Sequence, residues 1–429
     1  MLMKCLKGLM GAAALSLLGA CSTPMTPMTP MTACGADGRL CAPAQPNTSA
    51  TAHPRAADLA RTAPAPVPAP APVPQAEVQT MPVDAPGSQA TVKPAARGVR
   101  VGLILPLRSE ALGPPADALR AGFMAAHERD RDGIVVNLIE TGDGPTDTLD
   151  AYRGAIDAND IVVGPLARPA VSALASSGMV TKPTIALNHP DAREARLPGQ
   201  MLVIGLSIED EARQVAQWAA AEHPAARALI VSGPTNWQRR IATAFAAQWK
   251  QQGLQAQTVE IAATNGYLSE AGINQLKDRI EIEPPTLLFT ALDADQVRQV
   301  RGMLGPELLV YGTSSVNPGT EPGAATAELE GMRLLDMPWQ VQPDHPAVMV
   351  YPRWTGTRRT LDLDRLYALG IDAYRVAREL ALRPGASFKM DGVTGRLAVD
   401  VGAGGSRFER VQPRAVYEAG AFKPVTSPR

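Results

Sequence analysis

Five histidines and four cysteines are the side chains in this chain best suited to metal or nucleophilic chemistry. The histidines stand at positions 53, 127, 189, 223 and 345, and they form no H-E-x-x-H motif or other pair at ligand spacing. His127 follows Phe123 by one helical turn, which favours a packed or surface histidine over a metal ligand. The sequence also contains no G-x-S-x-G, G-x-G-x-x-G or Walker A motif. We therefore predict that the protein is not an enzyme and needs no metal or cofactor.

Cys21 ends the run LLGAC at positions 17–21, behind a front with Lys4 and Lys7 and an apolar stretch at 9–18 that is too short to span a bilayer. This segment resembles a bacterial lipobox. The resemblance implies that residues 1–20 are removed as a signal peptide and that Cys21 carries acyl chains, such as palmitate, on a membrane. Because Ser22 rather than aspartate follows the cysteine, it also implies the outer membrane, with the protein facing the periplasm. An ordinary secretory signal or an uncleaved anchor is the alternative.

Cys34 and Cys41 remain once Cys5 leaves with the signal peptide and Cys21 is acylated. An oxidising periplasm allows these two thiols to pair, so we expect a disulfide that closes a small loop. A zinc site is the weaker interpretation, because closed tetrahedral sites need additional His or Cys ligands.

Residues 21–97 have the composition of a tether. Thr-Pro-Met repeats occupy positions 23–31, and every second residue from Pro64 to Pro74 is proline. Alternation of Pro with Ala or Val favours extended, solvated polyproline II, so we expect a disordered, Pro-rich tether. The whole chain has 429 residues and a formal charge of −1, which becomes −3 when the two signal-peptide lysines leave. No basic field exists to attract nucleic acid.

Order is expected from Gly98 onward, where apolar runs with β-branched residues alternate with segments of helical periodicity. The predicted strands in this first series are 99–105, 134–139, 161–163, 184–187 and 201–206, and the predicted helices are 116–131, 146–158 and 168–176. Such alternation predicts a doubly wound parallel sheet.

A second series of the same kind begins at Ile208. Its predicted helices are 208–222, 237–252, 269–281 and 293–304, and its predicted strands are 228–232, 256–261, 286–290 and 308–311. The acidic residues that open helix 208–222 favour its positive N-terminal end. A later amphipathic helix at 363–382 precedes β-like segments at 397–401 and 408–417. We therefore predict an α/β domain at 98–429 with two lobes, the first comprising about 98–206 plus 340–429 and the second about 207–339.

Six short motifs give this region a family resemblance: VGLILPL at 101–107, VVGPL at 162–166, ALN at 186–188, DMPW at 336–339, GIDAYR at 370–375 and GVTGRL at 392–397. With them, the chain from about residue 99 to 425 resembles a type I periplasmic-binding-protein fold, and more narrowly the C-terminal domain of LpoA-type penicillin-binding protein activators. Asp336, Pro338, Trp339 and Asp372 lie in these motifs. We favour an architectural role for the motif residues over a direct contact with a partner.

The family resemblance implies an outer-membrane lipoprotein that activates a class A penicillin-binding protein, a peptidoglycan synthase, by protein contact. It thus implies regulation of an enzyme, with consequences for cell shape, rather than catalysis. The best-known members carry a helical-repeat domain before the C-terminal domain. Here a Pro-rich tether stands in that place, and no 34-residue helical period precedes Gly98.

A lipid-anchored solute-binding protein for an amino acid or another small ligand is the alternative function. In open α/β sheets, ligands bind beyond the carboxyl ends of the strands. That rule gives a candidate cleft of Arg108, Ser109, Gly164, Pro165, Asn188, Asn236, Trp237, Ser314 and Ser315. Trp237 or Arg108 would stack on or pair with a ligand. However, Leu187 and Asn188 stand where amino-acid binders of this fold usually have small hydroxyl residues, so a carboxylate clamp is not evident.

Overall fold

The computed structural model of the chain describes residues 98–191, 196–319, 327–356, 360–402 and 405–425. All of them belong to one compact unit, Gln89–Arg429. The predictions for the signal peptide, Cys21, the Cys34–Cys41 disulfide and the tether concern residues outside this description. No helix among the described residues is both long enough and apolar enough to cross a membrane.

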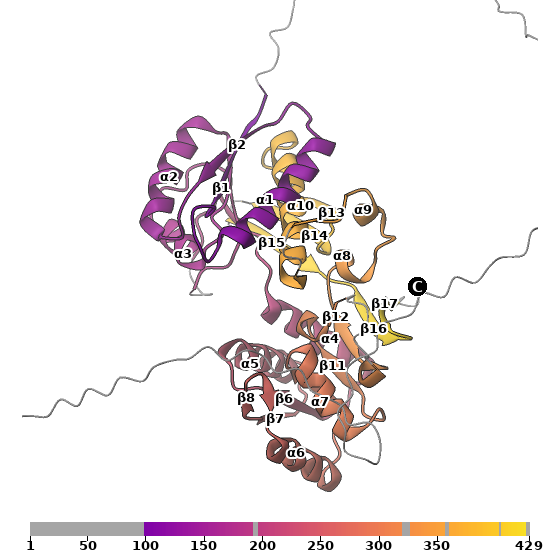
Figure 1. The fold of residues 1–429 in the computed structure, drawn as a ribbon. Coiled ribbons are helices and arrows are strands. Elements are labelled where there is room, and N and C mark those ends of the chain that lie inside the picture. The colour runs from indigo at the N-terminus through magenta and orange to yellow at the C-terminus, as the bar shows by residue number, and fades with distance from the viewer. Residues whose placement is uncertain (1–97, 192–195, 320–326, 357–359, 403–404, 426–429) are drawn as a thin grey trace, which may run out of the picture. The chain divides into compact units, whose positions relative to one another are not determined.

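A five-stranded, wholly parallel sheet in the order β2-β1-β3-β4-β5 forms the first lobe with helices on both faces (Figure 1). Its strands are β1 (Arg100–Leu105), β2 (Val135–Glu140), β3 (Ile161–Val163), β4 (Thr184–Ala186) and β5 (Met201–Val203). Its helices are α1 (Gly113–Arg129), α2 (Pro145–Ala158), α3 (Arg168–Ser176) and α10 (Leu361–Leu382). Strand β1 is buried on both faces: Leu103 packs in the core under α1 and α10, whereas Ile104 packs in the core under α2 and α3.

Two glycines let helices α1 and α10 cross at short range, and Figure 1 shows the two helices side by side. A Cβ at Gly370 would lie 2.0 Å from the carbonyl oxygen of Leu119, and one at Gly122 would lie 1.9 Å from that of Tyr367. Only glycine leaves room for backbones this close. The contact explains why a helix from the C-terminal part of the chain covers the N-terminal sheet.

A seven-stranded sheet in the order β17-β16-β12-β11-β10-β6-β7 forms the second lobe. Its strands are β6 (Ala228–Ser232), β7 (Ala256–Glu260), β10 (Leu287–Ala291), β11 (Val310–Gly312), β12 (Arg333–Leu335), β16 (Arg414–Glu418) and β17 (Ala421–Pro424). Helices α4 (Ile208–Glu222) and α5 (Asn236–Gln251) pack in the core on one face, and α6 (Glu270–Ile282) and α7 (Ala294–Leu304) in the core on the other. The α/β class with two lobes of parallel strands is thus confirmed, with antiparallel strands β16 and β17 added at one edge.

The shorter elements connect or flank these sheets. They are the hairpin β8 (Ala263–Thr264) and β9 (Tyr267–Leu268), the 3₁₀ turns η1 (Ser314–Val316) and η2 (Ala327–Leu329), helices α8 (Pro338–Val341) and α9 (Pro346–Met349), and the antiparallel sheet β13 (Phe388–Asp391), β14 (Arg396–Gly402) and β15 (Gly405–Val411).

Two expectations about the C-terminal part are wrong. We expected one strand at 408–417, but β15 pairs with β14 and β16 pairs with β12 of the second lobe. Pro413 separates them, because proline has no backbone N–H for a sheet ladder. Residues 340–429 therefore do not all return to the first lobe, since β16 and β17 complete the second sheet. Strand β12, only three residues long, was not predicted.

Candidate functional site

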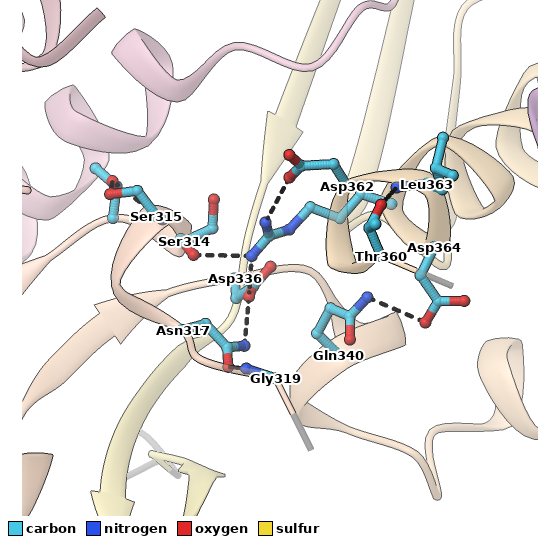
Figure 2. A network of polar contacts seen from close by, with 12 residues as sticks. Ser314, Ser315, Asn317, Gly319, Asp336, Gln340, Thr360, Asp362, Leu363 and Asp364 are labelled. Atoms are coloured by element: carbon cyan, nitrogen blue, oxygen red, sulfur yellow. Dashed lines mark hydrogen bonds and ion pairs between the residues drawn. The ribbon is translucent and has the colours of Figure 1, made fainter. Parts of the chain in front are cut away.

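Buried charged residues gather where strands β11 and β12 end and helices α4 and α10 begin. Ser314 follows β11, Asp336 follows β12, Glu211 lies in the first turn of α4, and Arg365 lies near the start of α10. Figure 2 shows Ser314, Asn317 and Asp336 grouped around this point. Because α10 packs on the first sheet whereas the other elements belong to the second, we call these residues the interlobe network.

Asp336 is the centre of the interlobe network and is fully buried. Its Oδ2 accepts hydrogen bonds from Asn317 Nδ2 at 2.7 Å and from Arg365 Nη2 at 3.0 Å, and its Oδ1 accepts one from the backbone N–H of Met337 at 2.8 Å. A buried carboxylate needs such partners, because desolvation of an unpaired charge is costly.

Arg365 joins the two lobes. Its side chain is 11% exposed, and besides Asp336 its guanidinium donates to the carbonyl oxygen of Ser314 at 2.8 Å and to Asp362 at 3.2 Å. Burial by itself would lower the pKa of Arg365, but the charge and hydrogen bond of Asp336, together with the charges of Glu211 and Asp362, outweigh burial and raise it. The guanidinium therefore stays charged and holds α10 to the ends of β11 and β12.

Glu211 is a second buried carboxyl group in the interlobe network. Its Oε2 accepts a hydrogen bond from the backbone N–H of Ser314 at 3.0 Å, and its Oε1 accepts one from Gln412 Nε2 at 3.1 Å. Burial raises the pKa of Glu211, the nearby charge of Asp336 raises it further, and the Ser314 contact opposes both. Gln412, 5% exposed, leaves its own Oε1 without a hydrogen-bond partner.

A second buried cluster joins two of the sequence motifs at Asp372. The carboxylate of this α10 residue accepts the backbone N–H groups of Val393 at 3.0 Å and Thr394 at 2.8 Å, and the Thr394 hydroxyl at 2.6 Å. Arg410 on β15 donates from Nε to Thr394 Oγ1 at 2.9 Å and from Nη2 to the carbonyl oxygen of Ile204 at 2.8 Å. Burial lowers the pKa of Arg410 to about 10. These contacts tie the motif at 370–375 to that at 392–397.

The motif at 336–339 is likewise internal. Trp339 is fully buried and its backbone N–H donates to the carbonyl oxygen of Val393 at 2.9 Å, while Pro338 occupies the first turn of α8. The guanidinium carbon of Arg353 lies 4.2 Å from the centre of the Trp339 ring. Asp336, Pro338, Trp339 and Asp372 thus all take part in packing between elements.

The structure brings together three of the nine cleft candidates. Trp237, Ser314 and Ser315 line a pocket of about 810 Å³ together with Arg365 and other charged residues from both lobes, namely Arg168, Glu209, Glu211, Arg240, Asp293, Asp295, Arg298 and Asp362. Acidic and basic side chains both occur there, and Arg240 pairs with Glu209 at 2.7 Å. The pocket is consequently lined by charges of both signs.

The other six cleft candidates do not line this pocket, because local contacts hold them elsewhere. Arg108 pairs with exposed Asp147 at 2.7 Å, and Ser109 donates to Asp143 at 2.9 Å. Gly164 and Pro165 follow β3 directly in the chain and are buried, and Asn188 donates to the carbonyl oxygen of Leu166 at 3.1 Å. Asn236 is exposed at the first residue of α5.

Sequence reasoning missed Glu211 and Arg365. Glu211 looked like one of several acidic residues that favour a helix N-terminus, yet it precedes buried Val215 and Trp218 by four and seven residues, which is the spacing of an inward helix face. No local pattern around Arg365 predicted its burial, because its partners Ser314 and Asp336 follow the distant strands β11 and β12. Among the described residues, no three His, Cys, Asp or Glu side chains are grouped so that they could hold a metal ion.

Two lobes of parallel strands, with a pocket at the carboxyl ends of those strands, define a type I periplasmic-binding-protein-like domain. Residues 94–407 match the family described as "LppC putative lipoprotein", and the chain belongs to that family. Its relatives include the penicillin-binding protein activators LpoA of Photobacterium profundum, 26% identical over 70% of this chain and 53% of theirs, and of Pasteurella multocida, 25% identical over 70% and 50%. The chain thus spans about half the length of the curated relatives it matches.

Solved structures share the fold. The LpoA C-domain from Haemophilus influenzae, described as a regulator of PBP1A, matches with a TM-score of 0.60 and 22% identity, over 76% of this chain and all of that one. A Chromobacterium violaceum protein described as a "putative branched-chain amino acid ABC transporter" matches with a TM-score of 0.62 and 35% identity, over 74% of this chain and all of that one.

Proposed function

We propose that this protein is an outer-membrane lipoprotein that activates a class A penicillin-binding protein by protein contact. Relatives named as penicillin-binding protein activators, aligned over 70% of this chain, support the proposal. The observation that carries it is the interlobe network, in which buried charges of the two lobes neutralise each other. Because Arg365 is paired with Asp336 and the carbonyl oxygen of Ser314, its charge is not left over for a solute.

The protein acts on the synthase by shifting a conformational equilibrium. Docking raises synthase activity only if the domain binds the active state more tightly than the inactive one. No side chain of this domain needs to take part in bond making. Activation is therefore a matter of which surface the domain presents.

The N-terminal segment gives this regulator its location. Acylated Cys21 holds the chain in the outer membrane, residues 21–97 act as the tether, and residues 98–429 form the docking domain on the periplasmic side. Mass spectrometry of the N-terminal peptide from envelope fractions tests the acylation, and separation of the two membranes tests the location. Recovery of the protein with inner-membrane vesicles would contradict the outer-membrane assignment.

Reconstitution tests the activation. The full chain is mixed with each purified class A penicillin-binding protein of the same cell, and glycan polymerisation and peptide crosslinking are followed separately. We expect a bound complex and an increase in at least one of the two rates. If no class A synthase binds the chain or changes either rate, the proposal is wrong.

The alternative is a solute-binding protein, which we propose as a second candidate. It is favoured by the pocket of about 810 Å³ that contains Trp237 and by the 35% identity to the Chromobacterium violaceum protein. A ligand that binds only the folded state raises apparent stability. Thermal unfolding in the presence of free amino acids distinguishes the two candidates. A shift that disappears in Trp237→Ala would favour the carrier, and no shift with any amino acid would favour the activator.

A further inference from the structure

A second pocket, of about 390 Å³, lies where the chain crosses between the two lobes. Most of its lining comes from the link between β5 and α4, from α4, and from the end of β15 with its link to β16. Among the described residues, it shares only Leu206 and Glu211 with the pocket that contains Trp237. We call it the crossover pocket. Its apolar lining residues are Val203, Leu206, Trp218, Leu335, Phe408 and Val411.

Three arginines line the crossover pocket, and two of them have no counter-ion in the part of the chain that the structure describes. Arg213 pairs with Asp210. Arg410 donates to a hydroxyl and to two carbonyl oxygens, all of them neutral acceptors. The guanidinium carbon of Arg414 lies 5.5 Å from the centre of the Trp218 ring, and none of its N–H groups has an acceptor among the described residues. The donors of Arg414 are therefore available to a ligand.

The acidic residues of the crossover pocket leave these two charges uncompensated. Asp210 is engaged by Arg213, and Glu211 is engaged by Ser314 and Gln412. Glu409 is exposed on β15. Removing a cation from water is costly without a counter-ion, and the fork of N–H groups on a guanidinium matches the two oxygens of a carboxylate. The crossover pocket is therefore suited to a ligand that carries a carboxylate.

Gln412 adds a hydrogen-bond acceptor to the crossover pocket. This residue is 5% exposed and precedes Arg414 by two positions. Its Nε2 donates to Glu211 at 3.1 Å, whereas its Oε1 has no hydrogen-bond partner among the described residues. A buried acceptor without a donor is unfavourable. A ligand that brings an N–H group close to its carboxylate would satisfy both Gln412 and Arg414.

We propose that the crossover pocket binds the α-carboxylate of an amino acid or of a peptide C-terminus. The carboxylate pairs with Arg414, and the neighbouring N–H donates to Oε1 of Gln412. In such a ligand both groups are attached to one carbon atom, which suits two protein side chains that line the same pocket. Phe408 and Val411 offer an apolar surface to the rest of the ligand. The proposal holds for an activator and for a solute carrier alike.

Calorimetric titration of the full chain, purified in detergent, tests the binding. The probes are the free amino acids, their N-acetyl derivatives, and the N-acetyl amino acid amides, which lack the carboxylate. We expect a member of the first or second set to bind at one site per chain, and its amide not to bind. Tighter binding of the N-acetyl form identifies a peptide C-terminus as the source, and tighter binding of the free form identifies an amino acid. If neither set binds, the proposal is wrong.

Arg414→Met tests the carboxylate contact. Loss of a hydrogen bond to a charged group should weaken binding of the best probe by about tenfold or more. Arg407→Met is the matched control, because Arg407 is exposed on β15 and does not line the crossover pocket. Trp237→Ala should also leave binding unchanged. Binding that is lost in Trp237→Ala but kept in Arg414→Met would overturn the proposal, since the ligand would then occupy the other pocket.

An exchange of atoms in the ligand tests Gln412. The analogue of the best probe in which the nitrogen is replaced by an oxygen without hydrogen should bind the natural chain about fivefold more weakly or worse. In Gln412→Leu the acceptor is gone, so the probe and its analogue should bind equally. The comparison is made within one variant, so a loss of stability from the broken contact with Glu211 does not affect it. Equal binding of probe and analogue to the natural chain would contradict the proposed contact.

Discussion

Arg365 and Asp336 form an ion pair between elements that belong to different sheets. The guanidinium Nη2 of Arg365 lies 3.0 Å from Oδ2 of Asp336, and the carboxylate is fully buried. Helix α10, which carries Arg365, packs on the first sheet, whereas Asp336 directly follows strand β12 of the second sheet. Helix α10 also crosses α1 closely at Gly370. The position of Arg365 therefore depends on this contact between the two helices, which involves another part of α10.

Replacing Arg365 should destabilise the domain strongly. Arg365→Met leaves Asp336 buried beside Glu211 without the neutralising charge, and loss of one partner of a buried pair costs about 3 to 5 kcal/mol. We expect a decrease of about that size in the free energy of unfolding in urea at pH 7. Addition of Asp336→Asn to this variant should recover part of the loss, because the stranded charge is then removed.

Arg153→Met serves as the control for that variant. Arg153 pairs with Asp150 on the surface of α2, and both side chains are 65% exposed. Such pairs contribute about 0 to 1 kcal/mol, so the control should change stability little. Equal effects of the two substitutions would contradict the role given to Arg365.

Glu211→Gln should make stability less dependent on pH. Burial raises the pKa of Glu211 in the folded protein above its value in the unfolded chain, so the folded state binds the proton more tightly. The stabilisation from that proton is complete below about pH 4.5, the ordinary value, and is lost as pH rises through the folded value. The neutral amide has no such loss. The free energy of unfolding of the variant, relative to the natural chain, should therefore be more favourable at pH 8 than at pH 5.

The partners of Glu211 allow this substitution. Gln412 has an unpartnered Oε1, so rotation of its amide would present that oxygen to the new amide N–H₂. Glu283→Gln is the comparison, because Glu283 is exposed and its ion pair with Arg227, at 2.8 Å, is a surface pair of the kind that contributes about 0 to 1 kcal/mol. A pH profile of Glu211→Gln that parallels that of the natural chain would exclude the predicted proton linkage.

Gly370→Ala and Gly122→Ala should each loosen the crossing of α1 and α10. The added Cβ would lie 2.0 Å from the carbonyl oxygen of Leu119 or 1.9 Å from that of Tyr367, so the helices must separate. Overpacking of this kind costs about 1 to 3 kcal/mol, and we expect the upper end for contacts with backbone atoms. The measurement is the midpoint and slope of urea unfolding.

Gly154→Ala is the control for the helix crossing. Gly154 lies exposed within α2, and nothing lies within 4 Å of the position of its Cβ. Because alanine is the better helix former by about 1 kcal/mol, this variant should be stabilised. Equal destabilisation by all three substitutions would contradict the close crossing as the cause, because a Cβ at Gly154 meets no neighbour.

Thr394→Val should weaken the cluster at Asp372. The Thr394 hydroxyl donates to Asp372 at 2.6 Å and accepts from Arg410 Nε at 2.9 Å, so valine leaves a buried guanidinium N–H without an acceptor. An unsatisfied buried donor costs about 1 to 3 kcal/mol, and we expect a loss of that size in the free energy of unfolding. Thr258→Val on exposed β7 should be close to neutral. If the two variants match, the hydroxyl at 394 is not a structural contact.

Local periodicity predicted most elements of the two lobes. The bounds expected for 161–163, 168–176, 208–222 and 228–232 are those of β3, α3, α4 and β6. Such segments bury apolar side chains on faces that repeat with the period of the element, so neighbours in the sequence suffice to identify them. Strand β12 has the sequence RLL, without the β-branched residues that mark β3, whose sequence is IVV. The segment 408–417 is divided between two sheets by pairing with distant strands, which no local pattern states.

The candidate cleft could be predicted only in part. Strand ends indicated Trp237, Ser314 and Ser315, which line one pocket, because parallel strands present their carboxyl ends on one side. The same rule placed Arg108 in the cleft, yet its side chain turns to Asp147, a partner 39 residues away on α2. A long charged side chain such as that of Arg108 points toward the nearest opposite charge. Tertiary packing decides which residue supplies that charge, so the sequence does not show the direction.

The sequence alone determined the α/β class, the order of most strands and helices in both lobes, and the family motifs, because these follow from side-chain periodicity and short local patterns. Tertiary structure decided that α10 returns to the first sheet while β16 and β17 join the second, since glycine contacts and strand edges choose among distant segments. It also decided that Glu211, Asp336 and Arg365 are buried together. Charged side chains are buried only where distant segments supply their partners, and no local pattern states which segments those are.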